Sequence, residues 1–387
     1  MNRREFSRRV AAAAAAAAAA ALAPPGRAEP PGRAEPPPAH TEPGAANVSV
    51  HARALYRSAL ILDCNSSPPE GRAPLPQADL DAVRGSGIDV IKYSVGGIND
   101  DFTTTVAAVA QVQRLIEAYP HHFTQVRVAG DFARAKAEGR LGIILSFESV
   151  EMLQGRLESL ALFRDLGVRV MQLSYNRKSP FAAGVMEPEG GGLTPLGRQA
   201  VAEMNRLGIA IDLSHANPAT TGDVLDLSTK SPLMTHAGCA AVHAHPRNKT
   251  DEQLRALADR GGVVGIFDLP YLTASPQQPT VADYLQHLEH ALKVAGEDHV
   301  GIGSDADILP LDLSEKGIAE LNRTFEQRRS AGLAAPEEDR PPYVVGLNTP
   351  RRIEIIADGL LKRGYPAGVV EKVIGANFAR AFADIWT

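Results

Sequence analysis

The chain has 387 residues, of which 44% are hydrophobic and 22% charged, and its formal net charge is -5. This length suits one large domain of the barrel type or two ordinary domains, and the composition is typical of a globular protein. Charges of both signs are scattered without a basic stripe, which argues against nucleic acid as a partner. We therefore expect a small-molecule or peptide ligand.

Residues 1–23 are typical of an export signal. The pair Arg3 and Arg4, followed by Phe6, precedes an unbroken alanine run at positions 11–21. A charged start and a weakly apolar centre indicate export, and the arginine pair resembles a twin-arginine signal. The alternative is an ordinary N-terminal helix, but polyalanine has no apolar stripe with which to pack on a core. We expect a periplasmic or extracellular protein whose mature form has no membrane span.

Residues 24–48 form a second segment, in which PPGRAE is repeated in tandem. Its proline content predicts a disordered, partly extended linker. Residues 49–387 are expected to form a single domain. Cys64 and Cys239 are the only cysteines; we expect both to be reduced and buried, with a disulfide between them as the alternative.

Eight short apolar runs alternate with amphipathic stretches, a pattern that predicts parallel strands covered by helices and hence an α/β fold of the (β/α)8, TIM-like barrel type. The alternative is a doubly wound open sheet, but residues 63–71 lack the glycine-rich turn that such a sheet needs after its first strand. The predicted strands are 59–65, 87–94, 141–148, 168–175, 209–215, 232–238, 262–268 and 299–305, and the predicted helices include 105–118, 157–166, 196–207, 251–258 and 281–295.

A polar residue stands at or near the end of each predicted strand. In a parallel barrel the carboxyl ends of the strands form one face, where barrel enzymes build their sites. These eight residues are therefore expected to surround one pocket. They are Asn65, Ser94, Glu148, Tyr175, His215, His236, Asp268 and Asp305.

Glu148, His215 and His236 are the candidate metal ligands. The two histidines lie one β/α unit apart, so adjacent strands present one imidazole each. Two imidazoles and a carboxylate suit a divalent metal such as zinc, with coordination left for water. Such a metal lowers the pKa of its bound water to about 7 and so provides a nucleophile. The alternative for each histidine is a hydrogen-bonded residue at a strand end.

Two further residues are candidates for catalysis and binding. Asp305 is a metal ligand, a general acid/base, or a capping residue at a turn. Arg247 lies in a polar loop, where its guanidinium either binds a substrate carboxylate or faces solvent. His243 and His245 follow the strand rather than end it, so we interpret them as loop residues.

Several motifs together resemble the membrane (renal) dipeptidase family, the M19 metallopeptidases. They are GLTPLGRQAVAEMNRLGIAIDLSH, MTHAG, HPRN, HVGIGSD and KVIGANFARAF, in this order from residue 192 to residue 382. The resemblance extends over about residues 60–382 and implies a β/α barrel hydrolase that cleaves dipeptides with two zinc ions. It implies that Glu148 bridges the metals and that His215 and His236 complete one metal site. It further implies that Arg247 binds the terminal carboxylate and that Asp305 is the acid/base.

The chain departs from the family at two places. The first strand of the family ends in Asp-Gly-His-Asn-Asp, whose His and second Asp hold the other metal, whereas Asn65 and Ser67 stand at those positions here. Neither side chain replaces that donor pair, so one zinc ion is expected rather than two, with Asn65 facing the substrate. Tyr175 takes the place of a histidine that steadies the oxyanion in the family, and its phenol can donate one hydrogen bond there.

These observations leave three hypotheses. The first is an exported zinc-dependent hydrolase that cleaves a dipeptide or a similar small amide with a free carboxylate. The second is an enzyme of changed chemistry that tailors a peptide-derived compound after export. The third is a non-catalytic protein that binds a peptide on the same scaffold. The sequence leaves homodimer formation open.

Overall fold

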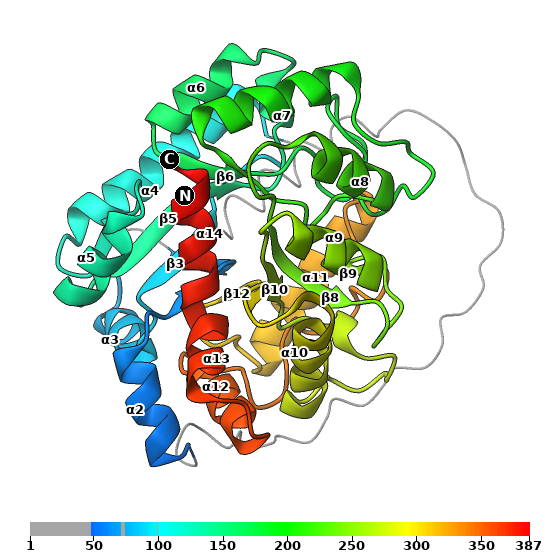
Figure 1. Ribbon diagram of the computed structural model, residues 1–387. Coiled ribbons are helices and arrows are strands. Elements are labelled where there is room, and N and C mark those ends of the chain that lie inside the picture. The colour runs from blue at the N-terminus through cyan, green and yellow to red at the C-terminus, as the bar shows by residue number, and fades with distance from the viewer. Residues whose placement is uncertain (1–47, 71–73, 99) are drawn as a thin grey trace.

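A computed structural model describes residues 48–70, 74–98 and 100–387 (Figure 1). The predicted export signal and all of the predicted linker except Val48 lie outside the described residues. The first described helix, α2 (Val50–Ser58), begins after Ser49, whose hydroxyl accepts the N–H of Ala52 at 3.2 Å. A serine at this position satisfies one of the backbone donors that a helix start leaves unpaired.

Eight parallel strands form a closed ring, so the predicted β/α barrel is confirmed. β1 to β7 pair in the order β1-β3-β5-β6-β7, and β8, β10 and β11 pair in the order β11-β10-β8. Two seams join these sheets: Asp212 bridges to Leu233, and Cys64 N–H donates to the Ile302 carbonyl at 2.8 Å. The ring strands are β1 (Leu62–Asp63), β3 (Val90–Ser94), β5 (Leu141–Phe147), β6 (Val168–Met171), β7 (Ala210–Ile211), β8 (Met234–Cys239), β10 (Val264–Ile266) and β11 (Val300–Ile302).

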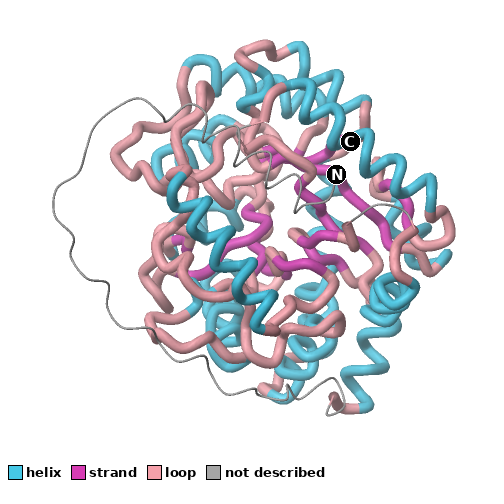
Figure 2. The backbone as a smooth tube through the Cα atoms, turned by 180° about the vertical axis from the view of Figure 1, so that it is seen from behind, coloured by secondary structure: helices cyan, strands magenta, loops and turns pink. Residues whose placement is uncertain are grey.

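Helices surround the strand ring, as Figures 1 and 2 show from opposite sides. Each of the five helices predicted from amphipathic stretches is present, and apolar residues of the strands and helices form one continuous core between the two layers. The α-helices that follow α2, the five predicted ones included, are α3 (Gln77–Ser86), α4 (Phe102–Ala118), α5 (Gly130–Glu138), α6 (Glu158–Asp165), α7 (Pro195–Leu207), α8 (Pro218–Leu227), α9 (Asp251–Asp259), α10 (Val281–Ala295), α11 (Glu315–Ser330), α12 (Arg352–Lys362), α13 (Ala367–Glu371) and α14 (Asn377–Ile385).

The C-terminal helix α14 crosses the strand ring in Figure 1 and packs against its interior. Phe378 and Phe382 belong to a buried cluster with Leu62 and Val90, which begin their strands. A side chain at Gly301 would lie 2.5 Å from the Phe378 ring, so only glycine fits at this contact. The helix therefore closes the amino-terminal end of the barrel, and the carboxyl ends of the strands remain for a site.

Four short strands were not predicted from the sequence. β2 (Ser66–Ser67) pairs with β12 (Ala306–Asp307), β4 (Phe123–Gln125) with β5, and β9 (Asn248–Lys249) with β8. β2 follows β1 and β12 follows β11, so their pairing brings the residues at the ends of β1 and β11 side by side.

Both cysteines are buried and free, as expected. Within the described ranges, no helix has the length and apolar character needed to cross a membrane.

Candidate metal centre and its surroundings

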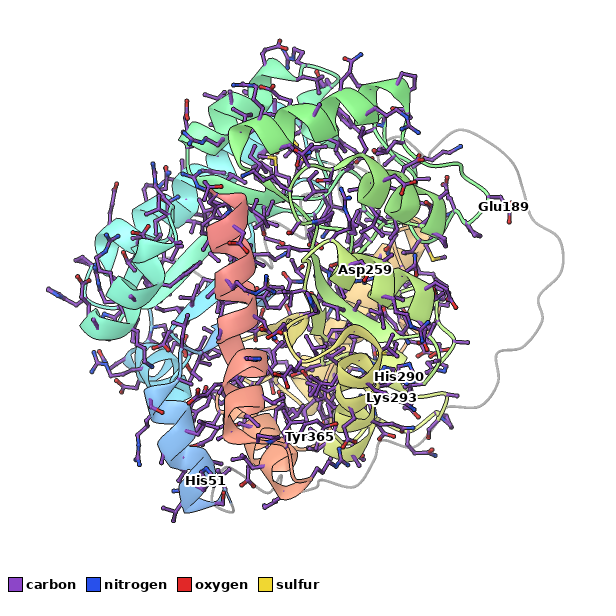
Figure 3. The ribbon with its side chains drawn as sticks, in the orientation of Figure 1. His51, Glu189, Asp259, His290, Lys293 and Tyr365 are labelled. Carbon is purple, nitrogen blue, oxygen red and sulfur yellow. The ribbon has the colours of Figure 1, made fainter. Side chains whose placement is uncertain are left out.

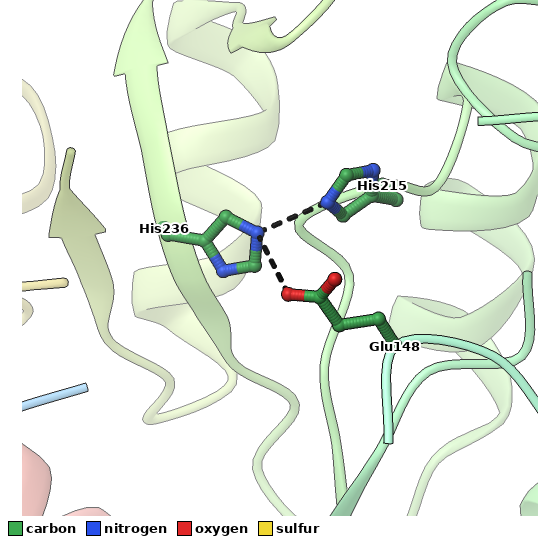
Figure 4. A group of neighbouring side chains, drawn as sticks. All are labelled: Glu148, His215 and His236. Carbon is green, nitrogen blue, oxygen red and sulfur yellow. Dashed lines mark hydrogen bonds and ion pairs between the residues drawn. The ribbon is translucent and has the colours of Figure 1, made fainter. Parts of the chain in front are cut away.

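Three of the predicted residues bring their ligand atoms together at the carboxyl ends of the strands. Glu148 follows β5, His215 follows β7 and His236 lies within β8. The Nε2 atoms of the two histidines are 3.0 Å apart, and the Glu148 Oε1 lies 3.8 Å from the His236 Nε2 (Figure 4). One ligand atom from each residue lies within 4.8 Å of the others.

Hydrogen bonds fix the protonation of the His215 ring. Its Nδ1 lies 2.7 Å from the Asn176 Oδ1, and the Asn176 Nδ2 donates to the Leu333 carbonyl at 2.8 Å. Because the amide oxygen can only accept, His215 Nδ1 carries the proton. The Nε2 of a neutral ring then bears a lone pair.

The same argument applies to His236 through Thr235. The Thr235 hydroxyl donates to the Asp212 Oδ2 at 2.6 Å, since an ionised carboxylate only accepts. The hydroxyl oxygen therefore accepts the Nδ1–H of His236 at 2.8 Å. The His236 Nε2 is left as an acceptor as well.

Two lone pairs thus face one another across 3.0 Å. Burial and the nearby Arg247 guanidinium hold the pKa of both histidines well below the usual range, so neither ring gains a proton readily. A cation between the two nitrogens removes their repulsion, and the Glu148 carboxylate balances its charge. The donor set of two imidazoles and one carboxylate therefore fits a divalent metal such as zinc.

A bulge in β8 aims His236 at this centre. Val264 and Ile266 of β10 pair with Met234 and Ala237 of β8, so β8 has one extra residue. Consecutive strand residues normally point to opposite faces. The bulge changes this local alternation. Both Thr235 and His236 therefore contact groups at the end of β7.

The Asp212 carboxylate holds the backbone around both histidines. It accepts four hydrogen bonds, from the N–H and hydroxyl of Ser214 and from the N–H and hydroxyl of Thr235, at 2.6–3.0 Å. Its counter-ion is the Lys92 ammonium at 3.7 Å, and both side chains are fully buried. Asp212 therefore positions the candidate metal ligands and is not itself one of them.

We expect Thr235→Val to weaken zinc binding by about 10- to 100-fold, as the loss of such supporting hydrogen bonds generally does. The substitution keeps the shape of the side chain and the buried Lys92–Asp212 ion pair, but removes the acceptor of the His236 Nδ1–H. Thr235→Ser, which keeps the hydroxyl, is the matched control and should bind zinc like the unmodified chain. Competition with a fluorescent chelator gives the dissociation constants, and equal affinity in the valine and serine variants would contradict this role.

Asn65 and Asp305 adjoin the metal centre. The Asn65 Nδ2 donates to the Asp305 Oδ1 at 2.7 Å and makes a longer contact of 3.4 Å with the Glu148 Oε1. The Asp305 N–H donates to the Asn65 carbonyl at 2.7 Å, and Asp305 has a φ of 55°, which is uncommon for a residue other than glycine. Ser67 instead lies in β2 opposite Asp307.

Arg247 is buried, so the interpretation as a solvent-facing arginine is wrong. Only 3% of its surface is exposed, and its guanidinium lies 5.7 Å from the centre of the Phe267 ring. One nitrogen donates weakly to the His236 carbonyl at 3.4 Å. Its Nε is buried without a hydrogen-bond partner among the described residues. A buried guanidinium with an unused donor fits an anionic ligand.

Tyr175 lies against the other histidine. Its ring stacks on the His215 imidazole with the centres 4.1 Å apart, and its hydroxyl accepts a hydrogen bond from the Arg328 Nη2 at 3.0 Å. Burial raises the pKa of this hydroxyl, which keeps it protonated as a donor. Arg328 belongs to α11 and was not among the residues predicted from the sequence.

His243 and His245 do not join the metal ligands. The His245 Nε2 donates to the Pro336 carbonyl at 2.9 Å, and the ring stacks on Tyr271. His243 pairs with Glu337 at 3.2 Å. Both histidines therefore contact the segment that follows α11, residues 331–338, in agreement with their interpretation as loop residues.

A shallow hollow lies outside the strand ring, away from the metal ligands. Figure 3 labels three residues at it, His290 and Lys293 on α10 and Tyr365 between α12 and α13. Its other lining residues are Ala241, Val242, Gln286 and Glu289.

Comparisons with known proteins identify a family and several relatives. The family model described as membrane dipeptidase, peptidase family M19, matches residues 69–320. An uncharacterized dipeptidase of Schizosaccharomyces pombe is 32% identical over 258 residues, which are 64% of this chain and 62% of that protein. A dipeptidase of Claviceps purpurea is 28% identical over 284 residues, which are 73% of this chain and 60% of that protein. The chain thus spans about three-fifths of the length of these curated relatives.

A solved structure is also similar. An amidohydrolase of Pseudomonas aeruginosa superposes with a TM-score of 0.76 at 28% sequence identity. The superposition covers 87% of this chain and 99% of that one. The similarity therefore extends over nearly the whole barrel.

Proposed function

We propose a substrate and a mechanism from one premise: the chain belongs to the membrane dipeptidase family, peptidase family M19. Our proposal is that it hydrolyses a dipeptide, or a similar small amide with a free carboxylate, with the help of one zinc ion. The proposal rests on the two histidine Nε2 atoms that face one another as acceptors, because a cation between them would remove their repulsion. The relatives named as dipeptidases support the reaction class.

Glu148, His215 and His236 would hold the zinc ion. When bound, zinc supplies a hydroxide nucleophile at neutral pH by lowering the pKa of water to about 7. Asp305 accepts the proton of the nucleophile on its carboxylate and returns it to the leaving amine. Asn65 fixes the Asp305 carboxylate through its amide at 2.7 Å. Tyr175 donates a hydrogen bond from its hydroxyl to the oxyanion that forms at the attacked carbonyl and keeps its proton.

Asn65 also supports the proposal of one zinc ion. Its amide nitrogen lies between two carboxylates, those of Glu148 and Asp305, and directs hydrogen-bond donors at both. A second metal between these carboxylates would face the N–H groups of the amide, which repel a cation and cannot act as ligands.

We expect Arg247→Ala to raise KM about 10- to 150-fold for dipeptides with a free C-terminal carboxylate, which is the effect of losing a charge-assisted hydrogen bond. The value of kcat should change little, because this contact lies away from the reacting carbonyl. The matched control is the same dipeptide with an amidated C-terminus, whose KM should be alike for the two proteins. An unchanged KM for the free acid would rule out this role.

Hydrolysis assays test the proposed function directly. Purified full-length chain, loaded with zinc, should release free amino acids from members of a panel of L,L and L,D dipeptides, and N-acyl amino acids serve as a second amide class. If the zinc-loaded protein leaves both the dipeptides and the N-acyl amino acids intact, the proposal is wrong. Cleavage of the N-acyl compounds alone would restrict the substrate to small amides other than dipeptides.

We further propose export through a twin-arginine signal, which the sequence of residues 1–23 supports. Fusion of residues 1–48 to a reporter that is active only after export should give a signal. Replacement of both Arg3 and Arg4 by lysine should abolish that signal, and retention of the signal would contradict the twin-arginine assignment.

A further inference from the structure

We propose that Arg328 is a positioning residue, which acts through Tyr175 by polarising the phenol and directing its proton toward the oxyanion. This inference rests on the proposed function and extends it to α11, most of which lies beyond the stretch that the family model matches. The inference assigns a role in the reaction to Arg328, whose side chain makes no hydrogen bond to the candidate metal ligands or to Arg247 among the described residues.

The first support is the direction of the hydrogen bond between the two side chains. The Arg328 Nη2 donates to the Tyr175 hydroxyl at 3.0 Å, and a guanidinium cannot accept. The hydroxyl proton must therefore point elsewhere. No other hydrogen bond of this hydroxyl is present among the described residues, so its proton is free for a ligand.

The second support is the place of the phenol. The Tyr175 ring stacks on His215 with an angle of 26° between the rings, and so lies directly beside a metal ligand. During attack on an amide carbonyl the oxyanion forms beside the metal centre, so a donor at this position can stabilise it. The positive charge on the other side of the hydroxyl oxygen makes its proton a stronger donor, because hydrogen bonds reinforce one another along a chain.

The third support is that the guanidinium is held in place. Glu338 pairs with the Arg328 Nε and accepts from its Nη2 at 3.2 Å. The same carboxylate accepts the N–H of Ala335 at 3.0 Å, which ties it to the backbone after α11. The guanidinium is therefore oriented before a substrate binds and needs no rearrangement during the reaction.

The segment after α11 is itself fixed to the strand ends. Asn176 donates to the Leu333 carbonyl at 2.8 Å, and His245 donates to the Pro336 carbonyl at 2.9 Å. Asn176 also orients His215, so one side chain connects this segment to the metal centre. A competing explanation follows from these contacts, namely that Arg328 only fastens the segment.

A double-mutant cycle separates the two explanations. The variants are Arg328→Gln, Tyr175→Phe and the double variant, all as zinc-loaded full-length chain, with the exposed neighbour Arg329→Gln as matched control. We expect Tyr175→Phe to lower kcat about 100- to 1,000-fold, the usual effect of removing one oxyanion donor. Arg328→Gln should lower kcat about tenfold, the difference between a charged and a neutral hydrogen bond, with KM unchanged. In the Tyr175→Phe background it should have no further effect.

A fastening role predicts other results. The effects of Arg328→Gln and Tyr175→Phe on kcat would then multiply, or Arg328→Gln would change KM or zinc content, and either outcome would overturn the inference. Because Arg328→Gln could unfold the segment, Arg328→Lys is a second variant. It keeps the charge and should retain more of kcat than Arg328→Gln, and equal losses in both would also overturn the inference.

A binding experiment adds a readout that does not need turnover. A phosphinate dipeptide, which mimics the tetrahedral intermediate, should bind Arg328→Gln about tenfold more weakly, whereas a product amino acid should bind equally. Equal loss for both ligands would contradict the role. If the unmodified zinc-loaded chain hydrolyses neither dipeptides nor N-acyl amino acids, the proposed function fails. If it hydrolyses either class and Arg328→Gln behaves like Arg329→Gln, only this inference fails.

Discussion

His236→Ala is expected to abolish tight zinc binding and to reduce dipeptide hydrolysis to the background rate. The substitution removes one of three ligands, and it leaves the His215 Nε2 and the Glu148 carboxylate without the third donor that a stable site needs. His215→Ala should have the same effect, because the two imidazoles stand in equivalent positions 3.0 Å apart. Metal analysis after dialysis, together with the hydrolysis rate, measures both results.

His243→Ala is the matched control for this experiment. It removes an imidazole of the same rim that pairs with Glu337 and contacts none of the metal ligands, so it should retain zinc and activity. Undiminished zinc in the His236→Ala protein would show that the metal is held elsewhere. It would contradict the site built on the lone pairs of the two histidines.

Asp305→Asn is expected to lower kcat about 100- to 10,000-fold while zinc remains bound, since an amide cannot accept the proton that a general base takes. The side chain keeps its size. The Asn65 Nδ2, which donates to the Asp305 Oδ1 at 2.7 Å, can donate to the oxygen of the new amide instead. The fold should therefore persist. Rates at saturating substrate and zinc content, measured on the same preparation, check both parts of the expectation.

The same substitution at Asp307 provides the control. Asp307 is an exposed residue of β12, two positions after Asp305, and its replacement by Asn should leave kcat unchanged. A nearly active Asp305→Asn protein would show that another group handles the proton. Loss of zinc from Asp305→Asn would instead show that Asp305 is a metal ligand, the alternative that the sequence left open.

The barrel could be predicted from the sequence because its signal is local. Each ring strand is buried over most of its length and so appears as a largely apolar run, with a polar residue at or near the end that lies at the shared rim. Glu148, His215 and His236 follow from this regularity. Closure of the ring brings these residues to one rim, and the bulge in β8 turns His236 so that the three ligand atoms lie within 4.8 Å of one another.

Other parts of the site depend on packing that no local pattern reports. The bulge in β8 adds a residue without a change in composition, and the protonation of His236 is fixed by Asp212 from another strand. Arg247 lies in a polar stretch of sequence that is typical of a surface loop, yet it is buried, and its N–H donates to His245, which contacts the segment after α11. Arg328 could not be placed, since its partner Tyr175 is distant in the chain.

Asn65 illustrates how sequence and structure complement each other. The family resemblance indicated that this position lacks a metal ligand, and the structure provides a physical role for the replacement. The amide donates to Asp305 and approaches Glu148, so it links the proposed acid/base to a metal ligand. Family membership and the presence of Asp305, the proposed acid/base, argue against a purely binding protein on this scaffold.

The central claim is that one metal ion, held by Glu148, His215 and His236, supports hydrolysis of a dipeptide. Its most direct test is to strip the purified chain of metal and to measure dipeptide hydrolysis as zinc is added stepwise. The account predicts that activity rises linearly and reaches its plateau at about one zinc ion per chain, as three protein ligands and one open position provide. A plateau at two ions per chain, or hydrolysis that needs no metal, would contradict it.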